Sequence, residues 1–397
     1  MSKSSSHDVI ISGGGTPGLT LALLLAQTGL RSVVIDPAPL SQFTISSPEG
    51  RTSALMQSSI AVLKQTGVWD MTLPYGAPLE ILRIIDDSFG NKTQQIETNF
   101  PACNIGLDFF GINMPNNILR SALAIAARQH KATTLCGSSR LTGFSTDDFG
   151  VTVNLDDGTS LRAPLLIAAD GRESPVREKS GIACWHHDYG QSAITCLIHH
   201  SSSHQNISTE FHRPGGPFTL VPLPGNTSSV VWVEKTADAD TFMALSRHNF
   251  TQALQDRTDS RLGRITLSSD PQSCPLIALR ARNFTARRVA LVAEAAHVLS
   301  PLGAQGLNLS LRDVDCLAKI IIKAAQTGMD IGAQSILATY EKQRRSDIWV
   351  RSISTDGLTR LVSHNHRPLH GLRRTGLKTI SMIEPLKVMA MQQGMAV

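Results

Sequence analysis

The chain has 397 residues, of which 41% are hydrophobic, so it is long enough to bury a large core and to form two or three domains. Its net charge is only +5, and the basic residues are scattered except near the C-terminus. A mild charge without a basic arm argues against nucleic acid as a partner. The polar N-terminus shows neither a secretory segment nor an apolar span, which predicts a cytoplasmic protein.

The first predicted element runs from Val9 to Asp36 in the order strand, glycine turn, helix and strand. Two short apolar runs, 9–11 and 33–35, predict the strands, and the apolar segment between them predicts the helix. The turn has the pattern G-x-G-x-x-G, which includes Gly13, Gly15, Thr16, Pro17 and Gly18. Between a strand and a helix this pattern predicts a dinucleotide-binding turn.

Each glycine of this turn has a predicted role. Gly13 forms the tight turn, Gly15 lets backbone N–H groups approach a pyrophosphate, and Gly18 lets the helix pack against the strand. The helix begins at the phosphate, where its unpaired N–H groups favour negative charge. Asp36 lies near the interval of about 20 residues at which an acid meets a ribose 2′-hydroxyl, and it would repel a 2′-phosphate. The turn therefore favours FAD or NAD over NADP, and the alternative is a βαβ crossover without a ligand.

The next elements are a second helix and the strands of a second layer. After a Ser- and Pro-rich loop over 37–50, apolar residues up to position 67 predict a helix that begins at Arg51. Arg51 is either an ordinary surface arginine or a cation near the cofactor. Alternating residues over 75–112 predict strands of a second layer, and a helix is predicted over 116–129 with Arg120 in its first turn.

The middle of the chain predicts β structure. Residues 133–168 read as a three-stranded meander with a hairpin turn at Asp157-Gly158 and a buried last strand over 165–168. From 184 to 285, strand-like runs alternate with turns, and a helical stretch follows near 239–256. This segment predicts an antiparallel sheet with helical cover, which would form the substrate-facing half.

The last third returns to the first domain. An apolar strand over 289–292 leads to a glycine-rich turn and then to a helix over 307–325. A glycine-rich turn that feeds a helix is a second anion-type site. Another helix is predicted over about 335–362, followed by a basic, amphipathic tail.

A metal site is not expected. The histidine doublets His186-His187 and His199-His200 lie in predicted strands, where neighbouring side chains point to opposite faces. Neither an H-x-x-x-H pair nor a carboxylate triad accompanies them.

Three motifs in order carry a family resemblance. The glycine turn is followed by D-G-x-x-S-x-x-R at 170–177, and then by A-E-A-A-H and S-P-L-G-A-Q-G-L-N over 293–308. This order resembles the FAD-dependent aromatic-ring monooxygenases of the p-hydroxybenzoate hydroxylase type, with the ubiquinone-biosynthesis hydroxylases as the nearest branch. The resemblance covers nearly the whole chain. The usual Gly-Asp of the third motif is Ala293-Glu294 here, which adds a Cβ at a tight turn and a methylene to the acid.

The resemblance and the predicted elements together imply an α/β fold with a Rossmann-like FAD-binding domain, an antiparallel-sheet substrate domain and C-terminal helices. The FAD-binding domain would combine a parallel sheet with a β-meander. The expected segments are 1–74, 103–183 and 286–362 for the FAD-binding domain, 75–102 and 184–285 for the substrate domain, and 363–397 for a helical tail.

The resemblance also implies which residues bind the cofactor. The glycine turn would hold the pyrophosphate and Asp36 the adenosine ribose, while Arg51 and Arg120 would contact FAD from neighbouring elements. The other expected contacts are Asp170 and Gly171 for FAD and NAD(P)H, Glu294 for the ribitol chain, and the backbone of Gly303, Gln305, Gly306, Leu307 and Asn308 for the flavin's pyrimidine edge. No catalytic residue is assigned, and His297 is interpreted as a structural histidine rather than a base.

In the resembled family, FAD reduced by NADH or NADPH reacts with O₂ to give a C4a-hydroperoxide, which hydroxylates an electron-rich ring. The expected substrate is a phenol or a prenylated ubiquinone precursor. Two alternatives are a flavin oxidoreductase of the same fold that does not hydroxylate, and a non-catalytic FAD-binding scaffold.

The tail leaves two alternatives. Its basic residues and near-helically spaced apolar residues fit a helix packed on its own domain with a solvated basic face. They also fit docking to an anionic membrane surface or to a partner of a biosynthetic complex, which would place the protein at the inner face of the membrane.

Overall fold

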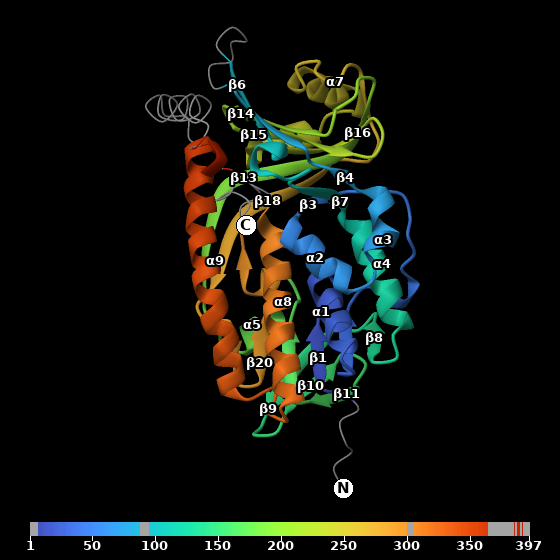
Figure 1. The fold of residues 1–397 in the computed structure, drawn as a ribbon, viewed down its shortest axis with the longest axis vertical. Coiled ribbons are helices and arrows are strands. Elements are labelled where there is room, and N and C mark those ends of the chain that lie inside the picture. Colours follow the sequence, from blue (N-terminus) through green and yellow to red (C-terminus); the bar gives the residue numbers. More distant parts are fainter. Residues whose placement is uncertain are drawn as a thin grey trace.

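The computed structural model describes residues 7–87, 95–299 and 305–363, together with 385, 387–389 and 391. It confirms the predicted α/β fold, with a parallel sheet in the lower half of Figure 1 and a large, mostly antiparallel sheet in the upper half. The long helices α8 (Gln305–Gln326) and α9 (Gln334–Ser363) run upright beside them.

The parallel sheet has the strand order β19-β20-β12-β1-β2-β8. Its four inner strands contain short, continuous apolar runs because this part of the sheet is covered on both faces. Helix α1 (Thr16–Ala26) is almost wholly buried and packs between α4 (Asn116–Gln129) and α8. The strands are β1 (Val9–Ser12), β2 (Ser32–Asp36), β8 (Thr133–Gly137), β12 (Leu165–Ala168), β19 (Thr285–Ala286) and β20 (Val289–Leu291).

The meander is shorter than the sequence predicted. It comprises β9 (Leu141–Thr146), β10 (Val151–Leu155) and β11 (Ser160–Ala163), and Gly158 turns the last hairpin at φ +84°. The flanking strands β8 and β12, which the prediction placed in the meander, belong to the parallel sheet. The continuous apolar run of β12 marks it as a strand of the parallel sheet, whereas β8 at the edge of that sheet has no such run and could not be told from a meander strand.

The predicted helix at Arg51 is wrong in its first half. Residues Thr52–Met56 form strand β3, and helix α2 begins only at Gln57 and ends at Gln65. Strand β3 pairs with β7 (Gly111–Pro115), which also pairs with β4 (Ala77–Pro78). Because this pairing joins residues about sixty positions apart, local periodicity could not reveal it. The neighbouring short helices are α3 (Trp69–Thr72) and α5 (Pro175–Lys179).

The large sheet has the strand order β21-β18-β13-β16-β15-β14-β5-β6, with β17 paired to β13. Helices α6 (Thr236–Met243) and α7 (Arg247–Arg257) replace the one predicted helical stretch and cover a face with its own core, which includes Phe211, Phe218 and Trp232. The strands are β5 (Ile81–Asp86), β6 (Ile96–Pro101), β13 (Cys184–His200), β14 (Ile207–Arg213), β15 (Gly216–Leu223), β16 (Thr227–Lys235), β17 (Ile265–Leu267), β18 (Gln272–Ala281) and β21 (His297–Val298).

Sheet membership follows the proposed division into domains at most places. Strands β5 and β6 join the sheet of residues 184–285, as expected for 75–102, and the β5–β14 pair is parallel rather than antiparallel. Strand β4 instead joins β7, and β21 of the segment 286–362 pairs with β18. We keep the division as a proposal. The basic tail lies almost wholly outside the described residues, so its helix and its docking stay predictions.

No helix in the described part of the chain has the length and apolar character needed to cross a membrane.

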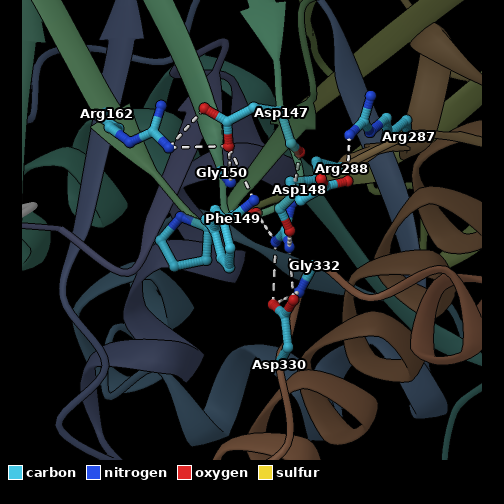
Figure 2. A network of polar contacts seen from close by, with 10 residues as sticks. Asp147, Asp148, Phe149, Gly150, Arg162, Arg287, Arg288, Asp330 and Gly332 are labelled. Carbon is cyan, nitrogen blue, oxygen red and sulfur yellow. Dashed lines mark hydrogen bonds and ion pairs between the residues drawn. The ribbon is translucent and has the colours of Figure 1, made fainter.

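A buried arginine connects the meander to the helices. Arg288 donates from Nη1 to the Pro164 carbonyl oxygen and to Asp330 Oδ1, each at 3.0 Å, and from Nη2 to Asp330 Oδ2 at 2.6 Å. It also donates to the carbonyl oxygens of Asp147 and Asp148, at the turn between β9 and β10. Figure 2 shows its guanidinium between this turn and Asp330, which lies between α8 and α9. The bond from Arg288 lowers the pKa of Asp330.

We predict that Arg288→Met lowers the free energy of unfolding by about 2–3 kcal/mol, because it removes several charged hydrogen bonds and strands buried carbonyl oxygens. Arg287→Met is the control: its partner Asp148 is 85% exposed, and such pairs contribute about 0–1 kcal/mol. Urea unfolding measures the free energy of unfolding of both variants.

The contribution of the Arg288–Asp330 pair to the free energy of unfolding depends on pH. Because the pKa of Asp330 is lowered in the folded protein, this contribution is complete above the ordinary carboxyl pKa of about 4 and is lost as the pH falls through the lowered value. An equal loss of the free energy of unfolding in Arg288→Met and Arg287→Met would contradict a stabilising role specific to Arg288.

Candidate cofactor-binding site

Two glycines of the first turn are required by the packing of the protein itself. A Cβ on Gly13 would lie 2.2 Å from the Ala169 carbonyl oxygen, and a Cβ on Gly18 would lie 2.0 Å from the Gly13 carbonyl oxygen. Gly13 also has φ +109°, which side chains rarely adopt. No larger residue fits at either position.

Gly15 differs from these two because nothing in the described protein requires a glycine there. Its φ of −75° suits any residue, and its Cβ would meet only Pro17 Cδ, at an ordinary 3.7 Å. The space next to Gly15 is therefore open to a ligand. Gly15 caps α1 without a side-chain hydrogen bond, and no acid stands in the first turn, which begins with Thr16 and Pro17. The positive end of the helix dipole thus faces this open space, and no capping side chain or acidic residue of the first turn neutralises it.

Asp36 and Arg120 meet at the glycine turn. Asp36 Oδ2 accepts a hydrogen bond from the Gly14 N–H at 2.6 Å, and Oδ1 accepts from the Ala38 N–H at 2.7 Å and from Arg120 Nη2 at 3.1 Å. Arg120 Nε donates to the Gly14 carbonyl oxygen at 2.8 Å, and its guanidinium lies over the Phe43 ring. A carboxylate accepts about four hydrogen bonds, so Asp36 keeps an acceptor site for a ribose hydroxyl.

Arg51 lies just before β3, where its carbonyl oxygen accepts from the Asn116 N–H at the start of α4, at 3.0 Å. Its side chain is exposed and makes no hydrogen bond or ion pair with the described residues. Arg120 follows one turn later on α4. The structure therefore places Arg51 near the predicted site, and its positive charge is not paired with any described residue.

Asp170 carries an unpaired oxygen beside the glycine turn. It follows β12, and its Oδ2 accepts from the Val176 N–H at 3.2 Å and from Ser12 Oγ at 3.5 Å. Its buried Oδ1 accepts no hydrogen bond from the described residues, and burial raises the pKa of this carboxyl group against the lowering effect of Ser174 and the Val176 N–H. A buried polar atom without a partner points to a missing ligand. The next residue, Gly171, turns the chain at φ +84°.

Arg177 ties the Asp-Gly loop to the loop that follows β20. It is buried and donates to the Ala295 carbonyl oxygen at 3.0 Å and to the Arg172 carbonyl oxygen at 2.7 Å. The Arg172 side chain then pairs with Glu294, with Nε 3.4 Å from Oε2. The sequence showed Arg172 inside the motif without indicating this partner, which is 122 residues away.

Ala293 and Glu294 occupy a strained turn at the carboxyl end of β20. Ala293 has φ +58°, a left-handed backbone conformation that glycine adopts more easily than alanine. The tight turn predicted at this position is therefore confirmed. Glu294 is 44% exposed and points its carboxylate to Arg172. This edge of an open α/β sheet is where ligands bind. Binding of a ribitol by Glu294 stays a prediction.

His297 is a structural histidine, as interpreted from the sequence. It is buried, and its Nε2 lies 2.6 Å from Asp313 Oδ2, which also accepts from the Ala293 N–H. Arg344 Nε donates to Asp313 Oδ1 at 2.8 Å. Burial would raise the pKa of Asp313, but the charges and hydrogen bonds of His297 and Arg344 lower it. Asp313 therefore holds the strained turn, the histidine and α9 together.

The same network reaches the second glycine-rich turn. Arg344 Nη1 pairs with Asp347 Oδ2 at 2.6 Å, Arg351 Nε pairs with Asp347 Oδ1 at 2.7 Å, and Arg351 Nη1 donates to Gln305 Oε1 at 2.9 Å. Gln305 is the first residue of α8. The sequence analysis assigned no role to Arg344, Asp347 or Arg351 of α9, although their spacing of three and four positions on a predicted helix indicates ion pairs.

The start of α8 is anchored by Asn308. This buried side chain accepts from the Met56 N–H and from Ser59 Oγ, and it donates to the Ala54 carbonyl oxygen. Only its backbone is left for a cofactor. A Cβ on Gly306 would meet no described residue within 4 Å, Leu307 is half-buried, and α8 has no acid in its first turn. Gly303 lies outside the described residues.

No group of three or more His, Cys, Asp or Glu side chains able to hold a metal ion occurs within the described ranges.

We predict that Ala293→Gly stabilises the protein by about 0.5–1 kcal/mol, because it relieves a left-handed backbone that costs an alanine roughly 1 kcal/mol or more. Ala295→Gly, in the same turn but without a positive φ, should instead destabilise it by about 1 kcal/mol. Thermal unfolding of the two variants tests this contrast. Destabilisation by both would show that Ala293 carries no strain.

The comparisons with known proteins agree with this geometry. The FAD binding domain family model matches residues 6–350. Ubiquinone hydroxylase UbiL of Rhodospirillum rubrum is 35% identical over 98% of this chain and 89% of its own, and 3-demethoxyubiquinol 3-hydroxylase of Escherichia coli is 30% identical over 97% of both chains.

Solved structures share the fold. PqsL, a probable FAD-dependent monooxygenase of Pseudomonas aeruginosa, superposes with a TM-score of 0.79 at 21% identity, covering 94% of this chain and 99% of its own. p-Nitrophenol 4-monooxygenase PnpA of Pseudomonas putida also gives 0.79, at 20% identity, over 98% and 96% of the two chains. At the identity and coverage of its sequence relatives, the chain belongs to the FAD-binding aromatic-ring monooxygenase family, in the ubiquinone hydroxylase branch.

Proposed function

We propose that this enzyme uses FAD, NADH or NADPH, and O₂ to hydroxylate a phenolic ring, with prenylated ubiquinone precursors as its substrate class. The observation that carries the proposal is the open space at Gly15, on an uncapped helix and next to the unpaired oxygen of Asp170. The relatives support the substrate class, since they are named for hydroxylation in ubiquinone synthesis.

The residues present fit FAD. The backbone at Gly15 and the start of α1 would bind the pyrophosphate, where N–H groups and the helix dipole favour negative charge. Asp36 would bind the adenosine ribose through its remaining acceptor site, and Arg51 and Arg120 would add positive charge at the same end. Asp170 and Glu294 would accept hydrogen bonds from the hydroxyls of the cofactor.

The start of α8 would lie beside the ring system of the flavin. Its first N–H groups and dipole would stabilise negative charge there. Arg351 would hold this end of α8 in place through Gln305, and Asn308 would hold it against β3 and α2. When bound, the flavin supplies the redox chemistry, taking two electrons from NAD(P)H and passing one oxygen atom of O₂ to the substrate ring.

The test is an assay of the FAD-loaded protein with a phenol that carries a short prenyl chain, under ¹⁸O₂ and with NADH or NADPH. We expect the phenol to stimulate NAD(P)H oxidation, and one labelled oxygen atom to enter each product molecule. NAD(P)H oxidation without labelled product would instead indicate an oxidoreductase that does not hydroxylate. A yellow protein that consumes no NAD(P)H with any phenol would be a scaffold.

A further inference from the structure

The large sheet turns one face toward the cofactor side of the molecule. Phe211, Trp232 and Ile194 belong to the core under α6 and α7, so the residues that alternate with them lie on the opposite, inner face. On that face, Ser229 Oγ lies 2.7 Å from Thr52 Oγ1 of β3, and Tyr189 donates to Asp356 of α9 at 2.9 Å. The inner face is thus bordered by β3 on one side and by α9 on the other.

Between these borders the inner face has a middle row of half-buried residues, defined by strand register. Glu210 pairs with Ile84 and Thr219, and Thr219 pairs with Val231. All four residues of the middle row are partly accessible. The rows beside it are mostly covered, as Ala193, Val233, Leu197 and Ser229 show. The middle row is therefore the part of the inner face that is least covered by the protein.

The inner face reaches the predicted cofactor site at its β18 end. Cys274 of β18 pairs in register with Ala193, in the row next to the middle row. Arg172 Nη1 donates to Cys274 Sγ at 3.6 Å, and the same guanidinium pairs with Glu294. The ribitol contacts would thus lie at the β18 end of the inner face. Glu210 is four strands along the sheet from Cys274, about 19 Å away at the usual strand spacing, which leaves the length of the flavin ring system between the two ends.

One carboxylate stands in the middle row, and a histidine holds it. Glu210 Oε1 lies 2.8 Å from His212 Nε2, and the two side chains share the inner face because they are two positions apart. His212 is 6% exposed, whereas Glu210 is 17% exposed. His212 Nδ1 is buried and has no hydrogen-bond partner among the residues that the structure describes. This contact assigns the proton to Nε2, which donates to the carboxylate and leaves Nδ1 as a bare acceptor.

We propose that Glu210 accepts the hydroxyl proton of the phenol substrate and that His212 is the positioning residue that aims its carboxylate. This proposal rests on the proposed function and names the residue that receives the hydroxyl. The phenol O–H bond breaks, its electron pair stays on the phenolate oxygen, and the proton passes to the Glu210–His212 pair, whose charge changes from −1 to 0. A phenol has a pKa of about 10 and a carboxylic acid one of about 4, so the proton leaves as the oxygen atom is transferred, when the ring becomes electron-poor and the hydroxyl more acidic.

The rest of the middle row suits the remainder of such a substrate. Ile84 and Val231 are apolar, and Thr219 offers a hydroxyl and a methyl group. At the β5 end, Ile84 packs against a small core that contains Phe100 and Phe110. A phenol whose hydroxyl meets Glu210 would therefore find apolar contacts on both sides of it.

The test compares Glu210→Gln and His212→Asn with His199→Asn, an exposed histidine elsewhere in the same sheet that bonds to Thr227. The first readout is steady-state kinetics with the prenylphenol. General base catalysis contributes about 10²–10⁴-fold, so kcat of Glu210→Gln should fall at least about a hundredfold while KM changes little. His212→Asn should lose less, because the amide can still donate to Glu210. His199→Asn should match wild type.

The second readout does not need turnover. The prenylphenol, labelled with ¹³C at the hydroxyl-bearing carbon, is bound to the oxidised, FAD-loaded protein near neutral pH, and its chemical shift reports the hydrogen bond of the hydroxyl group. We expect the shift of a phenol that donates to a carboxylate in wild type, and a shift closer to that of the free phenol in Glu210→Gln. Wild type that shows this hydrogen bond without hydroxylating the phenol would refute the proposed function but support Glu210. Hydroxylation with the same chemical shift and kcat in Glu210→Gln would overturn the role of Glu210, as would a wild type that binds no phenol.

Discussion

The close packing of Gly13 and Gly18 is the constraint on which the rest of the site depends. With the space for a Cβ at Gly18 filled by the Gly13 carbonyl oxygen, and that at Gly13 filled by Ala169, α1 is pressed onto β1 and β12. This contact brings the start of α1, the end of β2 and the end of β12 to one edge of the parallel sheet. Gly15, Asp36 and Asp170 come from these three ends, so a single steric requirement assembles the phosphate, ribose and hydroxyl contacts.

Two features of the site destabilise the folded protein, and a buried network of hydrogen bonds and ion pairs compensates for them. Ala293 is held in a left-handed conformation, and Asp170 buries an unpaired oxygen, each of which disfavours the folded protein without a ligand. Asp313 compensates at the strained turn, because it bonds the Ala293 N–H, His297 and Arg344 together. Through Arg344 and Asp347 this network continues to Arg351 and Gln305, so α9 supports both glycine-rich turns.

The sequence predicted the parts of the fold that local patterns determine. The glycine turn, α4 with Arg120, the hairpin at Gly158 and the two long C-terminal helices follow from periodicity and turn chemistry. Strand β3 could not be predicted, because its identity depends on pairing with β7, about sixty positions away. The contact of Arg172 with Glu294 and that of Glu210 with His212 also escaped prediction, since motif order shows neither side-chain direction nor sheet register.

The affinity of Gly15→Ala for FAD tests the central claim, that FAD binds at the first glycine turn, most directly. An alanine fits the backbone and the surrounding protein at this position. Its weaker capping of α1 is offset by the lower backbone entropy of the unfolded chain, so the free energy of unfolding without FAD should stay within about 1 kcal/mol of wild type. The new methyl group would occupy the space of the pyrophosphate, so the Kd for FAD should rise at least about tenfold, equivalent to about 1.4 kcal/mol. An unchanged Kd in a stably folded variant would show that the cofactor does not approach Gly15, and would contradict the account.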